Sequence, residues 1–541
     1  MSRTAFRVLP ALMGRDAGRT LAVVLLALAL VGGVLLHRDY GVSWDEPQQR
    51  RIGQVSLNHV LETVGLREPR NDGSLDTFSD RDYGVAFELP AVVLERLLRL
   101  DDSQQIYHVR HLLTFVFFLV GVVATYLLAE KRFASRSFGV VAATLMFLHP
   151  RIFAHGFFNS KDSVFMSLWA VGLYTLIRLL DSPTTRNAII AGCAIGLASG
   201  VRVVGLGLLL LGIASIGVSV LARETSRRAA VKHSALMSLT AGGALFLVWP
   251  YLWSAPLQNL REAVANMARF RWGGSNRYFG EFVVGSDTPW HYTPVWIGIT
   301  TPIFILFLLA VGIWQTAVMA ARSKRLWIDR RSRTDVVVLA ALVGPILATS
   351  TLGSVLYDGW RQHQFVYPAI ALLATKGLHT LVAAWRQQRH YANTVLLVAI
   401  ILSSALTLLW MVRAHPLQNV YFNNLVVAEP REVFDVDYWG LANQRALEAI
   451  LRSDDRPLVT VAAVSATPLE VGLYGIHPRA RERLAVINPE EADYLITNYR
   501  SVPSPRRQDE LLTASGSLFH RIIVGGDIIL SVYDMTEEAA R

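Results

Sequence analysis

The chain has 541 residues, of which 52% are hydrophobic and 17% are charged. A soluble protein carries about 25% charged residues, so this composition indicates a polytopic membrane protein. The net charge of +10 does not indicate nucleic-acid binding, because the basic residues lie in short segments between apolar runs. A single cysteine, Cys193, excludes an intrachain disulfide and a cysteine-rich metal site.

The N-terminal segment 1–20 is basic and polar, and no small-residue cleavage site follows the apolar run after it. This pattern predicts an uncleaved signal anchor. Counting runs long enough to cross the bilayer gives about eleven spans. They lie near residues 20–36, 111–129, 138–149, 163–180, 187–201, 203–221, 234–253, 295–320, 336–353, 364–383 and 394–413, the third and fifth being short. Gly192, Gly196 and Gly200 predict a close-packing face on the fifth.

Lysine and arginine residues gather in every second connection between these spans. The basic segments are 3–19, 131–136, 178–186, 223–232, 322–333 and 386–389. The positive-inside rule places them in the cytoplasm, and the N-terminus with them. The loops 37–110, 150–162, 254–294 and 354–363, Arg202, and the tail from residue 414 are then outside.

The tail, residues 414–541, differs from the rest of the chain. Residues 458–464 and 493–497 are expected to be strands, and residues 441–451 an amphipathic helix. Gly525-Gly526-Asp527 between two apolar runs predicts a β-hairpin. We therefore expect a small extracytoplasmic α/β domain after a transmembrane domain that spans residues 1–413.

The first polar group outside is Ser43-Trp44-Asp45-Glu46-Pro47, directly after the first span. Ser43 and Glu46 fit a capping box at the start of a helix. Such a box leaves Asp45 free. A carboxylate at a membrane mouth points to a functional role, although a purely structural role remains the alternative.

The second group is the segment 149–162. On a helix, Arg151, His155, Asn159 and Asp162 share one face, which predicts an amphipathic helix lying along the membrane surface. The plainer alternatives are an anchor with solvated charges and, for Lys161 and Asp162, an ordinary start of the fourth span.

Three further groups lie on the same side. The segment 357–363 collects Asp358, Trp360, Arg361 and His363. The alternative is a turn at Asp358-Gly359 among interfacial aromatic residues. Arg202 could reach a lipid phosphate or simply snorkel to the interface. His291 and Tyr292 of loop 254–294 suit sugar or lipid contacts, or an aromatic belt.

Carboxylates and cations on one bilayer face suit the transfer of a sugar from a lipid phosphate. The acceptor hydroxyl needs a base, which a carboxylate can supply. The phosphate leaves with negative charge, which arginine and lysine stabilise. The spans provide a groove for the lipid tail.

The chain resembles the GT-C superfamily of membrane glycosyltransferases, in the branch of protein O-mannosyltransferases and the lipid A aminoarabinose transferase. The motifs are Trp44-Asp45-Glu46, residues 149–162, 357–363, 415–423 and Asp437-Tyr-Trp-Gly440, and the last three resemble bacterial members. The resemblance implies a polyprenyl-phosphate sugar donor, an inverting single displacement, Asp45 as the base and Asp162 as a second acidic residue. It implies no obligate metal, although some relatives use a divalent cation.

We therefore predict an inverting glycosyltransferase of the bacterial inner membrane that acts on the outer face. Asp45, Asp162 and Glu46 are the expected catalytic residues. The expected substrate-binding residues are Arg151, His155, Lys161, Arg202, Arg361, His363, Trp360, His291 and Tyr292. The sugar is not specified, and the acceptor could be a lipid, a glycan or a protein. Alternatives are a lipid-linked sugar flippase or transporter, a scaffold that binds cell-wall polymer, and a polymerase or ligase with a diphosphate-linked donor.

Overall fold

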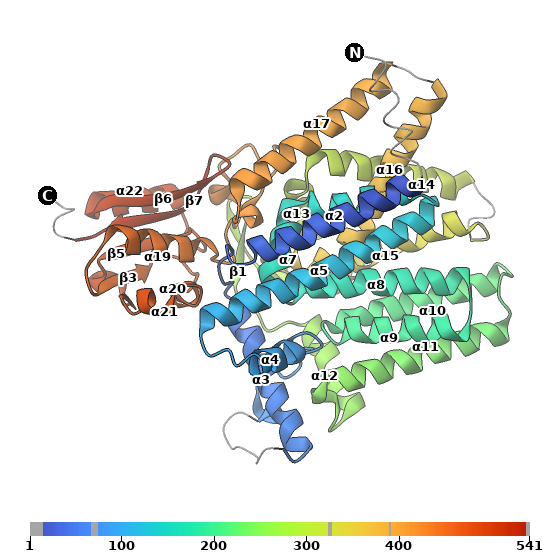
Figure 1. Cartoon of the computed structure of the whole chain (residues 1–541), viewed down its shortest axis with the longest axis horizontal. Coiled ribbons are helices and arrows are strands. Elements are labelled where there is room, and N and C mark those ends of the chain that lie inside the picture. Colours follow the sequence, from blue (N-terminus) through green and yellow to red (C-terminus); the bar gives the residue numbers. More distant parts are fainter. Residues whose placement is uncertain (1–14, 67–73, 323–326, 389–390, 537–541) are drawn as a thin grey trace.

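The structure is a computed structural model and describes residues 15–66, 74–322, 327–388 and 391–536. Most of the described chain forms a body of long helices, and the tail forms a smaller part with a β-sheet at one side of that body (Figure 1). The protein is therefore a polytopic helical membrane protein with an α/β part at its C-terminus. Residues 1–14, which make up most of the basic N-terminal segment 1–20, lie outside the described residues.

All eleven apolar runs form helices. Within the described residues, nine helical segments are long and apolar enough to cross a membrane. Their helices are α2 (Arg15–Leu36), α5 (Ser103–Phe133), α8 (Asp162–Asp181), α10 (Leu206–Leu221), α11 (Arg227–Val248), α14 (Ile303–Arg322), α15 (Arg330–Leu352), α16 (Tyr367–Gln388) and α17 (Tyr391–Ala414). The other two predicted spans are shorter, as their sequences indicated: α6 (Arg136–Phe147) has 12 residues and α9 (Thr185–Ser199) has 15.

Helix α9 returns the chain to the end of the body at which α8 begins. Asp162, the first residue of α8, forms an ion pair with Arg202, which follows α9. Gly192 and Gly196 of α9, and Gly200 directly after it, lie against α11, as predicted. A Cβ atom at Gly192 or Gly196 would come within 2.4 Å of a backbone oxygen of α11, so only glycine permits this approach.

The segment 150–158 departs from the sequence prediction. It forms a nine-residue helix, α7 (Pro150–Phe158), bent by 73° from α6. All of its residues except Phe153 are buried. The prediction of an amphipathic helix lying along the membrane surface is therefore wrong, because the polar face of α7 contacts other protein side chains rather than water.

The loops predicted to lie outside meet at one end of the helical body. They contain α3 (Glu46–Thr63), α4 (Glu88–Leu97), α12 (Pro256–Ala268), the hairpin of β1 (Ser275–Tyr278) and β2 (Glu281–Val284), and α13 (Tyr292–Thr300). Figure 1 shows α3, α4 and α12 side by side at this end.

Ion pairs join several helices away from these loops. Asp181 at the end of α8 binds Lys131 and Arg333, and Asp335 of α15 binds Arg132 and Lys376. Lys131, Arg132 and Arg333 belong to connections that the sequence predicts to be cytoplasmic, and Lys376 lies within α16.

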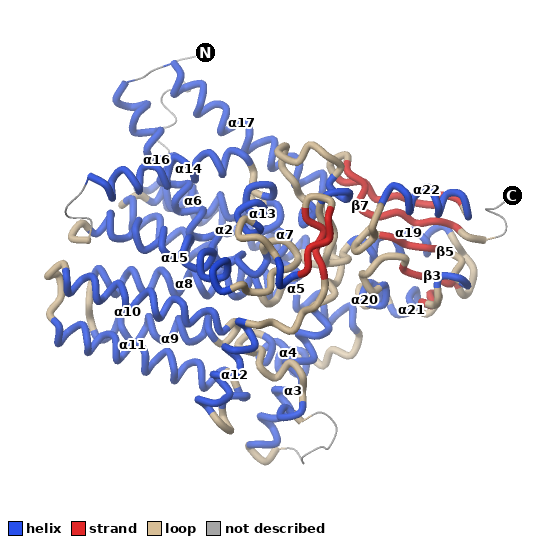
Figure 2. The backbone as a smooth tube through the Cα atoms, turned by 180° about the vertical axis from the view of Figure 1, so that it is seen from behind, coloured by secondary structure: helices blue, strands red, loops and turns tan. Residues whose placement is uncertain are grey.

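The tail contains a five-stranded sheet with the order β4-β3-β5-β7-β6, which Figure 2 shows in red. Its strands are β3 (Val459–Ala463), β4 (Leu484–Val486), β5 (Tyr494–Thr497), β6 (Ser517–Val524) and β7 (Asp527–Asp534). Strand β3 pairs in parallel with β4 and β5, whereas β7 is antiparallel to β5 and β6. The predicted strands and the hairpin at Gly525-Gly526 are confirmed.

Short helices complete the tail. They are α18 (Pro430–Val433), α19 (Ala442–Ser453), α20 (Leu469–Leu473), α21 (Pro478–Arg481) and α22 (Pro505–Ser515). Helix α19 is the predicted amphipathic helix, and its apolar face is buried, with Leu447 and Ile450 fully covered.

Candidate active site

Asp45 lies immediately before α3, in the loop that leaves the first membrane helix. Its carboxylate accepts a 2.6 Å hydrogen bond from Nη1 of Arg361 and lies 3.8 Å from Nζ of Lys161. The side chain is 26% exposed, whereas those of Lys161 and Arg361 are nearly covered. Two cations thus hold a carboxylate that a substrate can still reach.

A second carboxylate stands beside this pair. Asp162 forms an ion pair with Arg202 and accepts a 3.0 Å hydrogen bond from Nδ2 of Asn159. It directly follows Lys161 in the chain, at the turn from α7 into α8. The ammonium group of Lys161 lies 4.7 Å from the ring centre of Tyr83, a cation–π contact.

Arg361 is held by aromatic rings as well as by carboxylates. Its guanidinium lies 4.7 Å from the ring centre of Tyr357 and 4.6 Å from that of Trp439. It also pairs with Asp358 at 3.3 Å, and Asp358 in turn accepts a 2.7 Å bond from Arg500 of the tail. The arginine therefore has a fixed position between two carboxylates.

These residues form a group here called the ionic cluster. Ion pairs join Lys161, Asp45, Arg361, Asp358 and Arg500 in one chain. The separate pair of Asp162 and Arg202 completes the cluster, because the charges of Arg361 and Lys161 also act on Asp162. Four cations face three carboxylates, which leaves one positive charge in excess. Such an excess, partly buried, favours the binding of an anion.

The cluster changes the proton affinity of its members. Burial raises the pKa of Asp45, but the positive charges of Arg361, Lys161 and Arg500 outweigh burial and bring it to about 2. Burial lowers the pKa of Lys161, and although Asp45 opposes this, the pKa is about 8. Asp45 is thus ionised at neutral pH, and Lys161 loses its charge just above neutrality.

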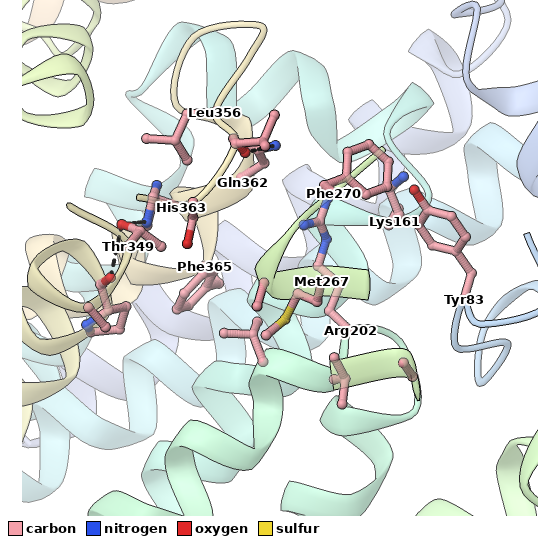
Figure 3. A pocket seen from close by; sticks show the side chains of 18 of the residues that line it. Tyr83, Lys161, Arg202, Met267, Phe270, Thr349, Leu356, Gln362, His363 and Phe365 are labelled. Atoms are coloured by element: carbon pink, nitrogen blue, oxygen red, sulfur yellow. Dashed lines mark hydrogen bonds between the residues drawn. The ribbon is translucent and has the colours of Figure 1, made fainter. Parts of the chain in front are cut away.

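Two cavities meet at Lys161. The first, of about 230 Å³, is mainly apolar and extends from Lys161 and Arg202 along α12 and α15. Figure 3 shows Tyr83, Lys161 and Phe270 at one end of it and Thr349 and His363 at the other. The second cavity, of about 320 Å³, is lined by Asp45, Asp80, Gln48, Gln49 and aromatic rings.

The two cavities share a wall. Tyr83, Lys161, Phe270 and Tyr357 line both of them. The apolar cavity suits a hydrocarbon chain, whereas the polar cavity offers carboxylates, amides and the rings of Trp44 and Trp272, which suit a sugar. Of the four residues in the shared wall, Lys161 belongs to the ionic cluster.

Glu46 lies outside this arrangement, although the sequence predicted it as a catalytic residue. Its carboxylate accepts a 2.7 Å bond from the Ser43 N–H, and its other oxygen lies 3.0 Å from Nε2 of His111. The predicted capping box is only partly present: α3 begins after Asp45, and the Ser43 hydroxyl donates to Glu46 instead of accepting from a helix N–H. The side chain is 3% exposed. Consecutive residues at the helix start point in different directions, so Asp45 faces the cavity and Glu46 faces the protein.

Arg151 is likewise not brought to the cluster. It donates to the Tyr421 carbonyl at 2.8 Å and lies 4.6 Å from the ring centre of Phe422. Within the described part of the chain it forms no ion pair. The structure therefore places this predicted phosphate ligand in the interior, because α7 is buried.

Two predicted histidines lie behind the cluster. His155 binds Gln364 at 3.0 Å and accepts a 3.2 Å bond from Trp439, the residue that stacks on Arg361. His363 lies between Thr293 and Thr349, at 3.2 and 2.9 Å, and lines the apolar cavity. His155 thus supports the cluster indirectly, and His363 lies along the apolar cavity.

The predicted aromatic ligands lie elsewhere. Trp360 is buried and donates a 2.9 Å hydrogen bond to Thr300. His291 binds the hydroxyl of Tyr278 at 2.7 Å, and Tyr292 is fully buried beside the same ring. None of these three residues lines either of the two cavities.

The sequence analysis grouped Asp358 with Arg361 but did not include it among the expected site residues, and it missed Arg500 altogether. Arg500 lies about 140 positions further along, in the tail. One signal was present: Asn498-Tyr499-Arg500 directly follows a predicted strand, and the carboxyl ends of parallel strands commonly carry functional side chains.

In the described residues, no group of three or more histidine, cysteine, aspartate or glutamate side chains could hold a metal ion. The carboxylates of the ionic cluster are instead paired with arginine and lysine.

One solved structure and one family model are similar to the chain. No curated protein matches the chain. The chain is similar to the solved structure of ArnT from Cupriavidus metallidurans bound to undecaprenyl phosphate, with 14% identity, a TM-score of 0.45, and 96% of this chain and 98% of that one covered. Residues 100–253, which include Lys161, Asp162 and Arg202, match the sequence model described as dolichyl-phosphate-mannose-protein mannosyltransferase. This part of the chain is thus similar to a family of membrane mannosyltransferases, the kind of protein that its motifs resemble.

Proposed function

We propose that this protein transfers a sugar from a polyprenyl-phosphate carrier to an acceptor hydroxyl. The observation that carries the proposal is the position of Asp45, whose carboxylate is in contact with Lys161 and Arg361 where an apolar and a polar cavity meet. The donor's lipid chain would occupy the apolar cavity, its phosphate would contact the cations, and the sugar would extend into the polar cavity. The matched family's name, with its lipid-phosphate sugar donor, supports the same class of reaction.

The reaction is a single displacement with inversion. The acceptor oxygen attacks the anomeric carbon of the sugar, and the bond from that carbon to the phosphate oxygen breaks. The electron pair of this bond leaves with the polyprenyl phosphate. Asp45 accepts the proton of the acceptor hydroxyl, as a general base within reach of the polar cavity.

The charge of the ionic cluster fits this change. A polyprenyl-phosphate sugar is a phosphodiester with one negative charge, which the single excess positive charge balances. Transfer turns the phosphate into a monoester with up to two negative charges. Protonation of Asp45 in the same step raises the net charge of the cluster to two, so positive charge grows as the leaving group becomes more negative.

The pairing of Asp45 with Arg361 also bears on its strength as a base. A carboxylate with a pKa of about 2 is a weak proton acceptor. The donor phosphate competes with Asp45 for Lys161 and Arg361, and a weaker hold by these cations raises the pKa of Asp45. Binding of the donor would therefore activate the base at the moment it is needed.

The proposal also covers the two domains of the chain and their orientation in the membrane. Residues 1–413 form the catalytic membrane domain, and residues 414–541 form an extracytoplasmic α/β domain. The basic connections lie in the cytoplasm of a bacterium, so the ionic cluster and the tail face the outside of the inner membrane. The acceptor is a lipid, glycan or protein hydroxyl on that side, and the sugar is a hexose or a pentose.

The test is transfer in proteoliposomes that contain a radiolabelled polyprenyl-phosphate sugar and an envelope extract as acceptor. We expect the label to move to the acceptor with the wild type and not with Asp45→Asn. Translocation of the intact donor without transfer would instead identify a flippase. Activity with a diphosphate-linked donor alone would identify a polymerase or ligase, and either result would overturn the proposal.

A further inference from the structure

We propose that the C-terminal domain supplies Arg500 as a positioning residue that holds Arg361 against Asp45, an inference that rests on the proposed function. A continuous chain of ion pairs links the domain to the candidate base. Nη2 of Arg500 lies 2.7 Å from Asp358, Asp358 lies 3.3 Å from Arg361, and Arg361 lies 2.6 Å from Asp45. The tail is then part of the active site rather than an appended domain.

Burial makes this chain rigid. Asp358 is fully buried, and the side chains of Arg500 and Arg361 are 5% and 3% exposed. A buried carboxylate needs full compensation of its charge. Since Asp358 has two arginine partners, Arg361 can share its own charge between Asp358 and Asp45. If Arg500 were absent, Asp358 would depend on Arg361 alone and would draw its guanidinium away from Asp45.

The backbone on both sides of this contact is unusual. Asp358 has a φ of 56°, and Tyr499 and Ser501, the neighbours of Arg500, have φ values of 63° and 58°. Non-glycine residues rarely adopt this left-handed conformation, and it is concentrated at functional sites. The turn at Asp358 is held by Asn276, whose side chain accepts a 2.9 Å bond from the Asp358 N–H. The turn at Asp358 is thus fixed in the conformation that brings its side chain to Arg500.

Arg500 also contacts the loop that carries the base. Its guanidinium lies 4.1 Å from the ring centre of Trp44, the residue before Asp45, and it donates to the Tyr438 carbonyl. Trp439, the next residue of the tail, stacks on Arg361 and accepts a 3.2 Å bond at its carbonyl from the Trp44 N–H. The tail therefore touches Arg361 and the Asp45 loop from the same side.

A second arginine of the tail provides a matched control. Arg431 has the same side-chain exposure as Arg500, 5%, and also contacts acidic and aromatic partners, but these lie within the tail. They are Glu429, Asp509 and the ring of Tyr499. Replacing Arg431 removes a buried cation of the tail without altering the charge next to Arg361.

The activity test compares Arg500→Gln, Arg500→Lys, Arg431→Gln and the double variant Arg500→Gln/Asp358→Asn, each as the full chain. We expect Arg500→Gln to lower kcat about 10- to 100-fold, because Arg361 drawn towards Asp358 is misplaced for the leaving phosphate. Arg500→Lys keeps the charge and should retain more activity. The double variant should be more active than Arg500→Gln, because no unpaired Asp358 competes for Arg361. Equal losses in Arg500→Gln and Arg431→Gln would overturn the inference.

A labelling test does not depend on sugar transfer. Carbodiimide reacts with accessible carboxylates that are protonated or weakly paired, and mass spectrometry measures its addition to Asp45. Arg500→Gln should speed the modification of Asp45 relative to the wild type and Arg431→Gln. An unchanged rate would overturn the inference. If the wild type transfers no sugar but the labelling rates differ as expected, the proposed function fails while the positioning role of Arg500 stands.

Discussion

Arg361 donates a 2.6 Å hydrogen bond to Asp45, although the two residues are 316 positions apart in the chain. The contact joins the loop after the first membrane helix to the loop before α16. It gives Asp45 a negative charge at neutral pH and gives Arg361 a defined direction towards the cavity. Both consequences lead to measurable expectations.

Asp45→Asn should abolish most of the transfer activity. The amide cannot accept the proton of the acceptor hydroxyl, and loss of a general base lowers rates about 10²- to 10⁴-fold. The measurement is kcat/KM with a labelled polyprenyl-phosphate sugar in proteoliposomes. Asp39→Asn is the matched control: Asp39 lies in the same loop, its side chain is 45% exposed, and it pairs with His415 rather than with the ionic cluster. Full activity of Asp45→Asn would exclude Asp45 as the base.

The pH dependence of kcat/KM should report Lys161. Its pKa of about 8 means that the ammonium form, which binds the donor phosphate, is present below pH 8 and is lost as the pH rises through that value. We therefore expect kcat/KM to fall above pH 8. The donor does not contribute to this change, because a phosphodiester does not titrate near neutrality.

Lys161→Arg identifies the group responsible. Arginine stays charged up to a pH of about 12, so the decrease above pH 8 should disappear in this variant even if its maximal rate is lower. A decrease at the same pH in Lys161→Arg would assign the alkaline limb to another group and would remove Lys161 from the phosphate site.

Local sequence patterns predicted more of the fold than of the site. Apolar runs long enough to cross a bilayer determine the membrane helices by themselves, and Gly525-Gly526 is sufficient to specify a hairpin turn. The grouping of Asp45, Lys161, Asp162, Arg202 and Arg361 was anticipated from their common side of the membrane, because alternate loops of a helical body meet at one end.

The wrong predictions concern the direction and the burial of side chains, both of which depend on how the helices pack. A helical face with Arg151 and His155 has the same periodicity on a membrane surface and in a protein interior, so only the surrounding helices decide which applies. Glu46 and Asp45 are adjacent in sequence but point to opposite sides of the α3 start. Arg500 reaches the site only through the docking of the tail, which no local pattern encodes.

Glu46→Gln should affect stability rather than catalysis. Glu46 accepts from Ser43 and contacts His111 in a buried setting, and weakening such charged hydrogen bonds destabilises a protein by about 1–3 kcal/mol. We expect a lower melting temperature in detergent, and a kcat per folded molecule close to that of the wild type. A large drop in kcat with an unchanged melting temperature would restore Glu46 to the catalytic residues.

The apolar cavity should distinguish donors by the length of their lipid. Ala348 of α15 lines this cavity, and its side chain is exposed to it. Ala348→Trp fills space that a polyprenyl chain would occupy, and losing the burial of a few carbons costs about 1.5–3 kcal/mol, or roughly tenfold or more in KM. The KM for a long-chain donor should rise, while that for a short-chain donor with the same sugar should change little.

Leu347→Trp provides the control for this prediction. Leu347 is the neighbouring residue on α15 and is 58% exposed, but it does not line the cavity. The variant Leu347→Trp therefore adds the same side chain outside the cavity, and the KM should change for neither the long-chain nor the short-chain donor. If Ala348→Trp raised the KM for both donors equally, the added ring would be disturbing the phosphate or sugar site, and the lipid chain would have to follow another path from Lys161.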